Sequence, residues 1–165
     1  MNYKKISFFL ATIALLVVSF YFLKRDTKKT ILLVNVLSKE LYDDMHILGS
    51  EHVSYEDIDS ILETTWKKYD KNTIFVFYCS NYACSASGES AQTLVKAGFP
   101  NAYAYEGGMA EWFNLHSVDK SYKIVGVGKQ SYLQLPNISK EPAPNIKTIT
   151  AEELKNMLTK HNVKG

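Results

Sequence analysis

Arginine and cysteine are scarce in this sequence, and its basic residues are unevenly placed. Arg25 is the only arginine among 165 residues, and six of the 19 lysines and arginines flank an apolar run near the N-terminus. Residues 30–165 hold 13 lysines and 16 acidic residues, so their formal charge is −3. A surface that binds nucleic acid needs clustered positive charge. The sequence therefore predicts no nucleic-acid partner.

The two cysteines, Cys79 and Cys84, lie within one six-residue stretch. Two cysteines placed in this way cannot form the set of disulfides that holds small secreted domains together. A metal site would need further ligands at a suitable spacing, and the four histidines are scattered along the chain. Residues 126–128 (GVG) lack the third glycine of a dinucleotide-binding fingerprint. We therefore expect neither a metal nor a cofactor.

The chain has only one long apolar run, and it lies at the N-terminus. Residues 6–23 carry no charge, and 18 residues of helix at about 1.5 Å each just span a hydrocarbon core of about 30 Å. A cleaved signal peptide is the alternative, but no small-x-small cleavage site follows and basic residues come at once. We expect an uncleaved single-pass anchor. The four basic residues after the run outnumber the two before it, which favours a domain on the cytoplasmic side. The sequence does not decide the side of the membrane.

Beyond residue 30, short apolar runs alternate with stretches of helical periodicity. Residues 31–37, 74–78 and 102–105 have the composition of buried strands, whereas residues 58–69 and 85–97 carry apolar side chains at helical spacing. Strands that alternate with helices of this length are typical of a parallel sheet covered on both faces. The sequence therefore predicts an α/β fold.

The stretch around Cys79 is the strongest candidate for a functional site. The strand at residues 74–78 ends at Cys79, at the edge of the sheet where α/β proteins bind their ligands. Because a helix is expected to begin near Ser85, Cys79 should face free backbone N–H groups and the positive end of the helix dipole. Both favour a thiolate, which makes Cys79 a candidate nucleophile. A buried structural cysteine is the alternative.

Four further motifs surround this stretch in a fixed order. They are residues 33–37 (LVNVL), 46–50 (HILGS), 98–101 (GFPN) and 105–112 (YEGGMAEW). Together with the order strand, cysteine, six-residue loop, serine and helix, they make the sequence resemble the rhodanese-like sulfurtransferase family over about residues 31–115. The resemblance implies a three-layer α/β fold with a mostly parallel five-stranded sheet. To this fold the sequence adds one predicted N-terminal transmembrane helix.

The resemblance also implies an activity. In that family the cysteine at the position of Cys79 accepts a sulfane sulfur as a persulfide and passes it to a thiol acceptor, in a two-step covalent mechanism. The backbone N–H groups of the loop are expected to stabilise the anionic sulfur. The loop consists of Ser80, Asn81, Tyr82, Ala83, Cys84 and Ser85. Phosphatases of related fold need an arginine at the position of Ser85, so phosphate chemistry is not expected.

Cys84 departs from the family pattern. Many members have an arginine or lysine at this position, which suits an anionic donor such as thiosulfate. With Cys84 there, we expect polysulfide or a small persulfide to be the better donor. Cys84 is also a candidate resolving thiol that attacks a persulfide or sulfenate on Cys79 and forms an internal disulfide. Alternatively it is only a small residue that faces the helix. Asn35 and Leu37 likewise replace the family's usual aspartate and arginine.

Two other functions stay open at this point. One is a thiol–disulfide redox protein that cycles the pair Cys79 and Cys84 between dithiol and disulfide. The other is a non-catalytic rhodanese-like module that serves as a membrane-tethered interaction domain. Nothing in the sequence identifies a protein partner.

The sequence divides into three parts. Residues 1–29 form the predicted anchor and its basic flanks, residues 30–116 the rhodanese-like domain, and residues 117–165 a C-terminal extension. Within the extension, residues 146–161 resemble the opening strand and helix of a rhodanese-like domain, a unit that is missing ahead of residue 30. We expect this segment to pack back on the domain as an edge strand and a helix. The alternative is a remnant of a second repeat.

Overall fold

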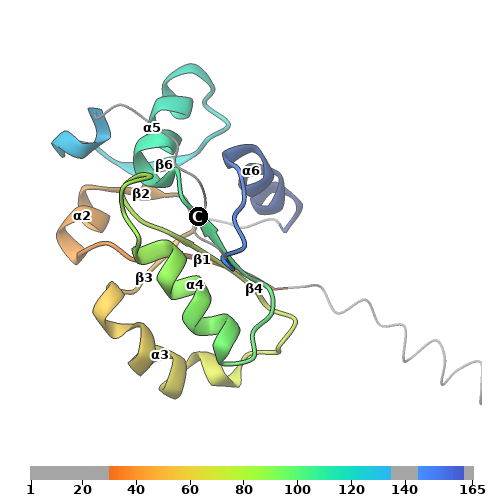
Figure 1. The fold of residues 1–165 in the computed structure, drawn as a ribbon. Coiled ribbons are helices and arrows are strands. Elements are labelled where there is room, and N and C mark those ends of the chain that lie inside the picture. Colours follow the sequence, from red (N-terminus) through yellow and green to blue (C-terminus); the bar gives the residue numbers. More distant parts are fainter. Residues whose placement is uncertain (1–29, 135–144, 162–165) are drawn as a thin grey trace, which may run out of the picture.

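The computed structural model of the chain describes residues 30–134 and 145–161 (Figure 1). Within these two ranges, no helix has the length and apolar character needed to cross a bilayer. The predicted membrane span, residues 6–23, lies outside the described residues and stays a prediction.

Four parallel strands form the main sheet. β1 (Ile31–Asn35) and β4 (Ile74–Tyr78) are the central pair, with β3 (Glu51–His52) beside β1 and β5 (Ala102–Tyr105) beside β4. The central strands are buried along most of their length. A parallel sheet with both faces covered needs such continuous apolar runs, which is why these strands could be recognised in the sequence.

The register of the sheet brings the carboxyl ends of its strands to one edge. Asn35, the last residue of β1, lies opposite Tyr78, the last residue of β4, and Tyr78 lies opposite Tyr105 at the end of β5. The segments that follow these three strands therefore begin side by side. Cys79 is the first residue after β4 and so lies at this edge.

The main sheet has four strands instead of the expected five. At the edge beyond β5, Thr148 forms a single parallel bridge with Ala104. The Ala104 N–H donates to the Lys147 carbonyl (2.8 Å), and the Ile149 N–H donates to the Ala104 carbonyl (3.0 Å). The pairing extends no further because Thr150 already caps the next helix. The expected edge strand is thus reduced to one bridge.

A second, antiparallel pair of strands has no counterpart in the sequence analysis. β2 (Met45–Ile47) follows α2 (Lys39–Asp44) and pairs with β6 (Ile124–Gly126). Three-residue strands are too short to show an alternating pattern, and these two are far apart in the chain. The pairing joins the segment after residue 117 to the body of the domain.

Helices cover both faces of the main sheet and make three layers (Figure 1). α3 (Ile58–Thr64) and α4 (Ala86–Lys96) lie on one face, and α5 (Gly108–Val118) and α6 (Ala151–Lys160) lie on the other. The first apolar cluster, on the α3 and α4 side, includes Leu32, Val34, Phe75, Phe77, Cys79, Ile58, Leu62, Ala91 and Leu94. The second apolar cluster, on the α5 and α6 side, includes Leu33, Val76, Tyr78, Tyr105, Met109, Trp112, Leu133 and Leu154.

The helix predicted over residues 58–69 is shorter in the structure. α3 ends at Thr64, and short 3₁₀ turns precede it (Tyr55–Asp57) and follow it (Trp66–Lys68). Two adjacent β-branched residues, Thr64 and Thr65, lie at the break and are poor helix formers. A third 3₁₀ turn, η3 (Ser131–Gln134), follows β6.

Residues 145–161 lie against the second apolar cluster. Thr150 and Glu153 form a reciprocal capping box at the start of α6. Leu154 is completely buried, and Ile149 and Ala151 are nearly so. This segment therefore contributes one bridge to the sheet and one helix to its face. The division of the whole chain at residues 29 and 116 stays a prediction.

Candidate active site

The loop between β4 and α4 is short and turns back on itself. The Asn81 carbonyl accepts a hydrogen bond from the Cys84 N–H (3.0 Å), and the Asn81 side-chain oxygen accepts one from the Ala83 N–H (3.0 Å). Ser85 is the residue before α4, and its hydroxyl makes no capping hydrogen bond. The loop is therefore closed mainly by Asn81.

The first turn of α5 holds the start of this loop. The Met109 N–H donates to the Cys79 carbonyl (2.9 Å), and the Ala110 N–H donates to the Ser80 carbonyl (2.9 Å). Gly108 makes the close approach possible, because a Cβ there would lie 2.6 Å from the Cys79 carbonyl oxygen and its φ is +61°. The Tyr82 hydroxyl adds a hydrogen bond to Glu111 of α5 (3.2 Å).

The sulfur of Cys79 faces oxygen atoms. The side chain is completely buried, and its Sγ lies 3.5 Å from the Cys84 carbonyl oxygen and 4.0 Å from the Asn81 carbonyl oxygen. The Ser87 hydroxyl oxygen, on the first turn of α4, lies 3.6 Å away. Carbonyl oxygens accept hydrogen bonds and disfavour an anion beside them. The groups that lower the pKa of Cys79 belong to Ser87 in α4, whereas two of the expected loop N–H groups are used inside the loop.

The two cysteines have opposite pKa shifts. The pKa of Cys84 is lowered to about 6, first by the neighbouring Cys79 side chain and then, against the effect of burial, by the N–H groups of Ala86 and Ser80. The pKa of Cys79 is raised, first by the neighbouring Cys84 side chain and then by burial. The surroundings of the two sulfurs therefore favour a negative charge on Cys84 over one on Cys79.

The other loop residues lie where the sequence places them. Ser80, Asn81, Tyr82 and Cys84 are half-buried, whereas Ala83 and Ser85 are exposed. The sequence analysis missed Ser87, which is completely buried and contacts the Cys79 sulfur. Its position is two residues into the expected helix, where a serine could have been read as an inward-facing polar group in the first turn.

His46 lies in β2, away from the loop. It is half-buried, its ring stacks on that of Tyr42, and its Nδ1 lies 2.9 Å from the Tyr42 carbonyl oxygen. These contacts are those of a structural histidine. Over residues 30–134 and 145–161, no three side chains of the metal-binding types gather into a cluster.

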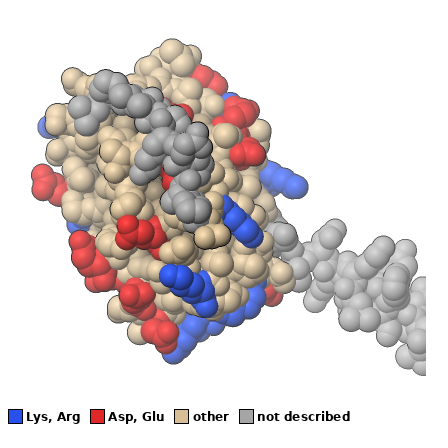
Figure 2. Space-filling model, viewed as in Figure 1, with Lys and Arg blue, Asp and Glu red and all other residues tan. Residues whose placement is uncertain are grey.

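Acidic groups belong to the immediate surroundings of the loop. The pKa of Tyr82 is raised to about 12 by burial and by the nearby carboxylates of Glu111 and Glu106. None of residues 79–85 is basic. The face shown in Figure 2 carries acidic and basic side chains in separate small groups. The site therefore has little to attract a doubly charged anion.

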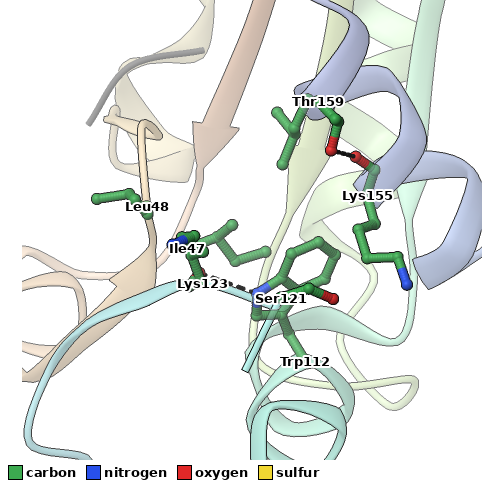
Figure 3. Close-up of a pocket in the computed structure, with 8 residues that line it drawn as sticks. Ile47, Leu48, Trp112, Ser121, Lys123, Lys155 and Thr159 are labelled. Atoms are coloured by element: carbon green, nitrogen blue, oxygen red, sulfur yellow. Dashed lines mark hydrogen bonds between the residues drawn. The ribbon is translucent and has the colours of Figure 1, made fainter. Parts of the chain in front are cut away.

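A separate cavity of about 200 Å³ lies between β2, α5 and α6 (Figure 3). Trp112 and Ile47 form part of its wall, and the side chains of Lys123, Lys155 and Thr159 line it as well. Neither cysteine lines it. Lys155 already pairs with Glu152 at 2.8 Å, so its charge is partly neutralised.

The pKa shifts predict which thiol of the full-length chain is alkylated first. Iodoacetamide should modify Cys84 with a rate that rises through a midpoint near pH 6 and levels off above it, because only the thiolate reacts. Cys79 should react slowly over the same range. In Cys79→Ala the midpoint of Cys84 alkylation should move towards higher pH, because the Cys79 side chain that lowers the pKa of Cys84 is gone. Peptide mapping would contradict this picture if Cys79 were modified first.

A comparison with sequence families places the chain in one of them. The model of the rhodanese-like domain family matches residues 21–115. The chain is 29% identical over 96 residues to the thiosulfate sulfurtransferase GlpE of Coxiella burnetii, an alignment that covers 58% of this chain and 84% of that protein. Among solved structures, a Bacillus halodurans protein aligns with a TM-score of 0.48 at 23% identity, over 69% of this chain and 74% of that one. A rhodanese from E. coli solved with anions aligns with a TM-score of 0.44 at 19% identity, over 59% and 100%. Because the family model spans more than half of the sequence, the chain belongs to the rhodanese-like domain family.

Proposed function

We propose that this protein is a sulfurtransferase that moves sulfane sulfur through a persulfide on Cys79. Membership of the rhodanese-like family and the similarity to a protein named as a sulfurtransferase support the reaction class. The observation that carries the proposal is the position of Cys79: it directly follows β4, a central strand, and its sulfur lies in the short loop that also holds Cys84. A cysteine held at such a position is a candidate nucleophile for covalent catalysis.

The sulfur transfer balances without an outside oxidant. The Cys79 thiol gives up its proton to solvent, and its sulfur attacks the outer sulfur of a donor R–S–SH. A sulfur–sulfur bond forms on Cys79, the bond within the donor breaks, and the donor leaves as R–S⁻ with the electron pair. An acceptor thiolate then attacks the outer sulfur, and Cys79 leaves and recovers a proton from solvent. Cys79 is oxidised by two electrons in the first half-reaction and reduced by two in the second, so the full cycle leaves the protein unchanged.

The charges around the loop bear on the choice of donor. A thiosulfate dianion would meet no basic side chain in the loop and two acidic ones nearby, Glu106 and Glu111. Polysulfides and small persulfides carry less charge on the part that enters the site. We therefore include polysulfides or persulfides as donors, and a thiol as acceptor, in the proposal.

A thiol–disulfide redox protein is the second candidate, and the low pKa of Cys84 favours it. In that reaction the Cys84 thiolate attacks a disulfide R–S–S–R and releases R–S⁻. Cys79 then attacks the Cys84 sulfur and releases the second R–S⁻, so that the protein is oxidised and the disulfide is reduced. The two candidates differ in mass, since one product gains a sulfur atom and the other loses two hydrogen atoms.

Sulfur loading tests the proposed function directly. Intact mass spectrometry of the full-length protein after exposure to polysulfide should show the gain of one sulfur atom, and peptide mapping should place it on Cys79. Cys79→Ser should abolish the gain. Cys84→Ala should keep the sulfur on Cys79, because the proposed carrier is unchanged. A persulfide found only on Cys84, or an internal disulfide without sulfur gain, would contradict the proposal.

Donor preference provides a second test. Steady-state rates should show that kcat/KM is lower with thiosulfate than with polysulfide. Cys84→Lys should lower the KM for thiosulfate, since it adds a positive charge beside the expected position of the dianion. Cys84→Ser, which adds no charge, is the matched control and should leave that KM unchanged. If the wild-type protein prefers thiosulfate, the electrostatic argument is wrong.

We also propose that residues 6–23 attach the protein to a membrane. The basic residues that flank this run favour a domain on the cytoplasmic side. The support is the uncharged run alone. Full-length protein expressed in cells should stay in the membrane pellet after washing at alkaline pH. Replacing two central residues, Ala14→Asp and Val17→Asp, should release it to the supernatant. Retention of the doubly substituted protein would argue against a span at these residues.

A further inference from the structure

A segment outside the family match lies over the edge of the sheet that carries Cys79. We call residues 127–134, which follow β6, the strap. The Asp44 carboxylate accepts hydrogen bonds from the N–H groups of Lys129 (2.9 Å) and Gln130 (3.3 Å), and the Asp44 carbonyl accepts one from Val127 (2.9 Å). Gly126, at the end of β6, permits the approach, because a Cβ there would lie 2.1 Å from the Asp44 carbonyl oxygen. The backbone of the strap is therefore anchored to Asp44.

The strap places Tyr132 at the end of the sheet. The side chain of Tyr132 packs against both apolar clusters, and these lie on opposite faces of the main sheet. A side chain that touches both faces has to lie beyond the ends of the strands or at an edge. The neighbouring Leu133 is almost completely buried in the second cluster. In Figure 1, η3 (light blue) lies at the same end of the sheet as the loop that joins β4 to α4.

The hydroxyl group of Tyr132 is buried and has no hydrogen-bond partner among the described residues. Its pKa is raised by burial first and then by the charges of Tyr78, Asp44 and Cys79, which are therefore its titratable neighbours. The Tyr78 hydroxyl is already bonded to Ser50 (2.8 Å). The Asp44 carboxylate is taken up by the strap backbone. A buried hydroxyl without a partner lowers stability, so its presence calls for an explanation.

The other buried polar atoms that lack a hydrogen-bond partner each have a polar neighbour that could become one. The Asn35 amide lies next to the Tyr78 hydroxyl, with which it is paired across β1 and β4. The Tyr105 hydroxyl and Glu111 Oε2 are both unpartnered, and Glu111 contributes, after burial, to the raised pKa of Tyr105. A small rotation would join each pair. For Tyr132, the neighbouring groups of Tyr78 and Asp44 already have other hydrogen-bond partners.

A sulfur atom added to Cys79 would need a donor of this kind. The resting Cys79 sulfur is next to two carbonyl oxygens, and the groups beside it that lower its pKa, a hydroxyl and an N–H, both belong to Ser87. The outer sulfur of a persulfide is anionic near neutral pH, and carbonyl oxygens repel it. It becomes stable only where hydrogen-bond donors replace the lost water.

We propose that the Tyr132 hydroxyl donates a hydrogen bond to the sulfur atom that Cys79 carries. The proposal rests on the proposed function and adds a substrate-binding residue to it. Tyr132 lies outside residues 21–115, so this donor belongs to the part of the chain beyond the family match. The strap is then a second wall of the sulfur site, facing the loop after β4.

The substitution Tyr132→Phe in the full-length chain tests this role, because stability and sulfur binding should move in different directions. Removing a hydroxyl that has no partner should leave the Tm unchanged or raise it. Loading of sulfur on Cys79 from polysulfide, followed by intact mass, should become about tenfold slower or more, because a hydrogen bond to a charged group is lost. Tyr69→Phe is the matched control. Tyr69 is a half-buried tyrosine on the first apolar cluster beside Phe75, near the amino end of β4, and its substitution should leave loading unchanged.

Each other outcome decides against the proposal. Wild-type loading rates in Tyr132→Phe would overturn the role of Tyr132 and leave the proposed function standing. A fall in Tm together with slower loading would mean that the hydroxyl is bonded in the resting protein and is structural. A wild-type protein that takes up no sulfur on Cys79 would overturn both the proposed function and this inference.

Discussion

The hydrogen bonds from the first turn of α5 to the carbonyl groups of Cys79 and Ser80 are the contact on which the candidate site depends. They join the end of β4, on one side of the loop, to a helix that packs on the opposite face from α4. Any side chain at Gly108 would prevent the contact. With two carbonyl groups held in this way, the path of the loop is constrained at its start, and Asn81 closes the turn that follows.

The same geometry explains why the two thiols differ. A buried loop can hold one negative charge at modest cost, but a second charge next to it would be strongly unfavourable. The lower pKa belongs to Cys84, which the N–H groups of Ala86 and Ser80 approach, and the higher one to Cys79, which is buried beside two carbonyl oxygens. The two thiols therefore share one negative charge more easily than they carry two.

The segment after residue 117 is more closely joined to the domain than its sequence suggests. β6 pairs with β2, and Asp44 accepts hydrogen bonds from three successive parts of the strap. The two glycines of the GVG stretch serve this packing, since a Cβ at Gly128 would meet the Met45 side chain at 2.5 Å. Glycines that have no place in a nucleotide fingerprint are thus explained by close contact between backbone segments.

Local patterns in the sequence determine the buried strands, the helix α4 and the position of the candidate nucleophile. The buried strands show as apolar runs because both faces of a parallel sheet are covered. The helix α4 can be recognised from the spacing of its apolar residues and from Gly98 (φ +86°), which follows its C-terminal end. The position of Cys79 at a strand end follows from these two elements, and so does the expectation of a thiolate in the loop.

Only the tertiary structure decided what depends on contacts between distant segments. The pKa values of the two thiols move apart because the path of the loop against α5 sets which groups reach each sulfur. The β2–β6 pair and the strap escape sequence analysis because three-residue strands carry no period. The fifth strand shrinks to one bridge because the capping box at Thr150 begins α6 one residue after Ile149. Periodicity reports which face of an element is buried, whereas the partner of that face is a property of the folded chain alone.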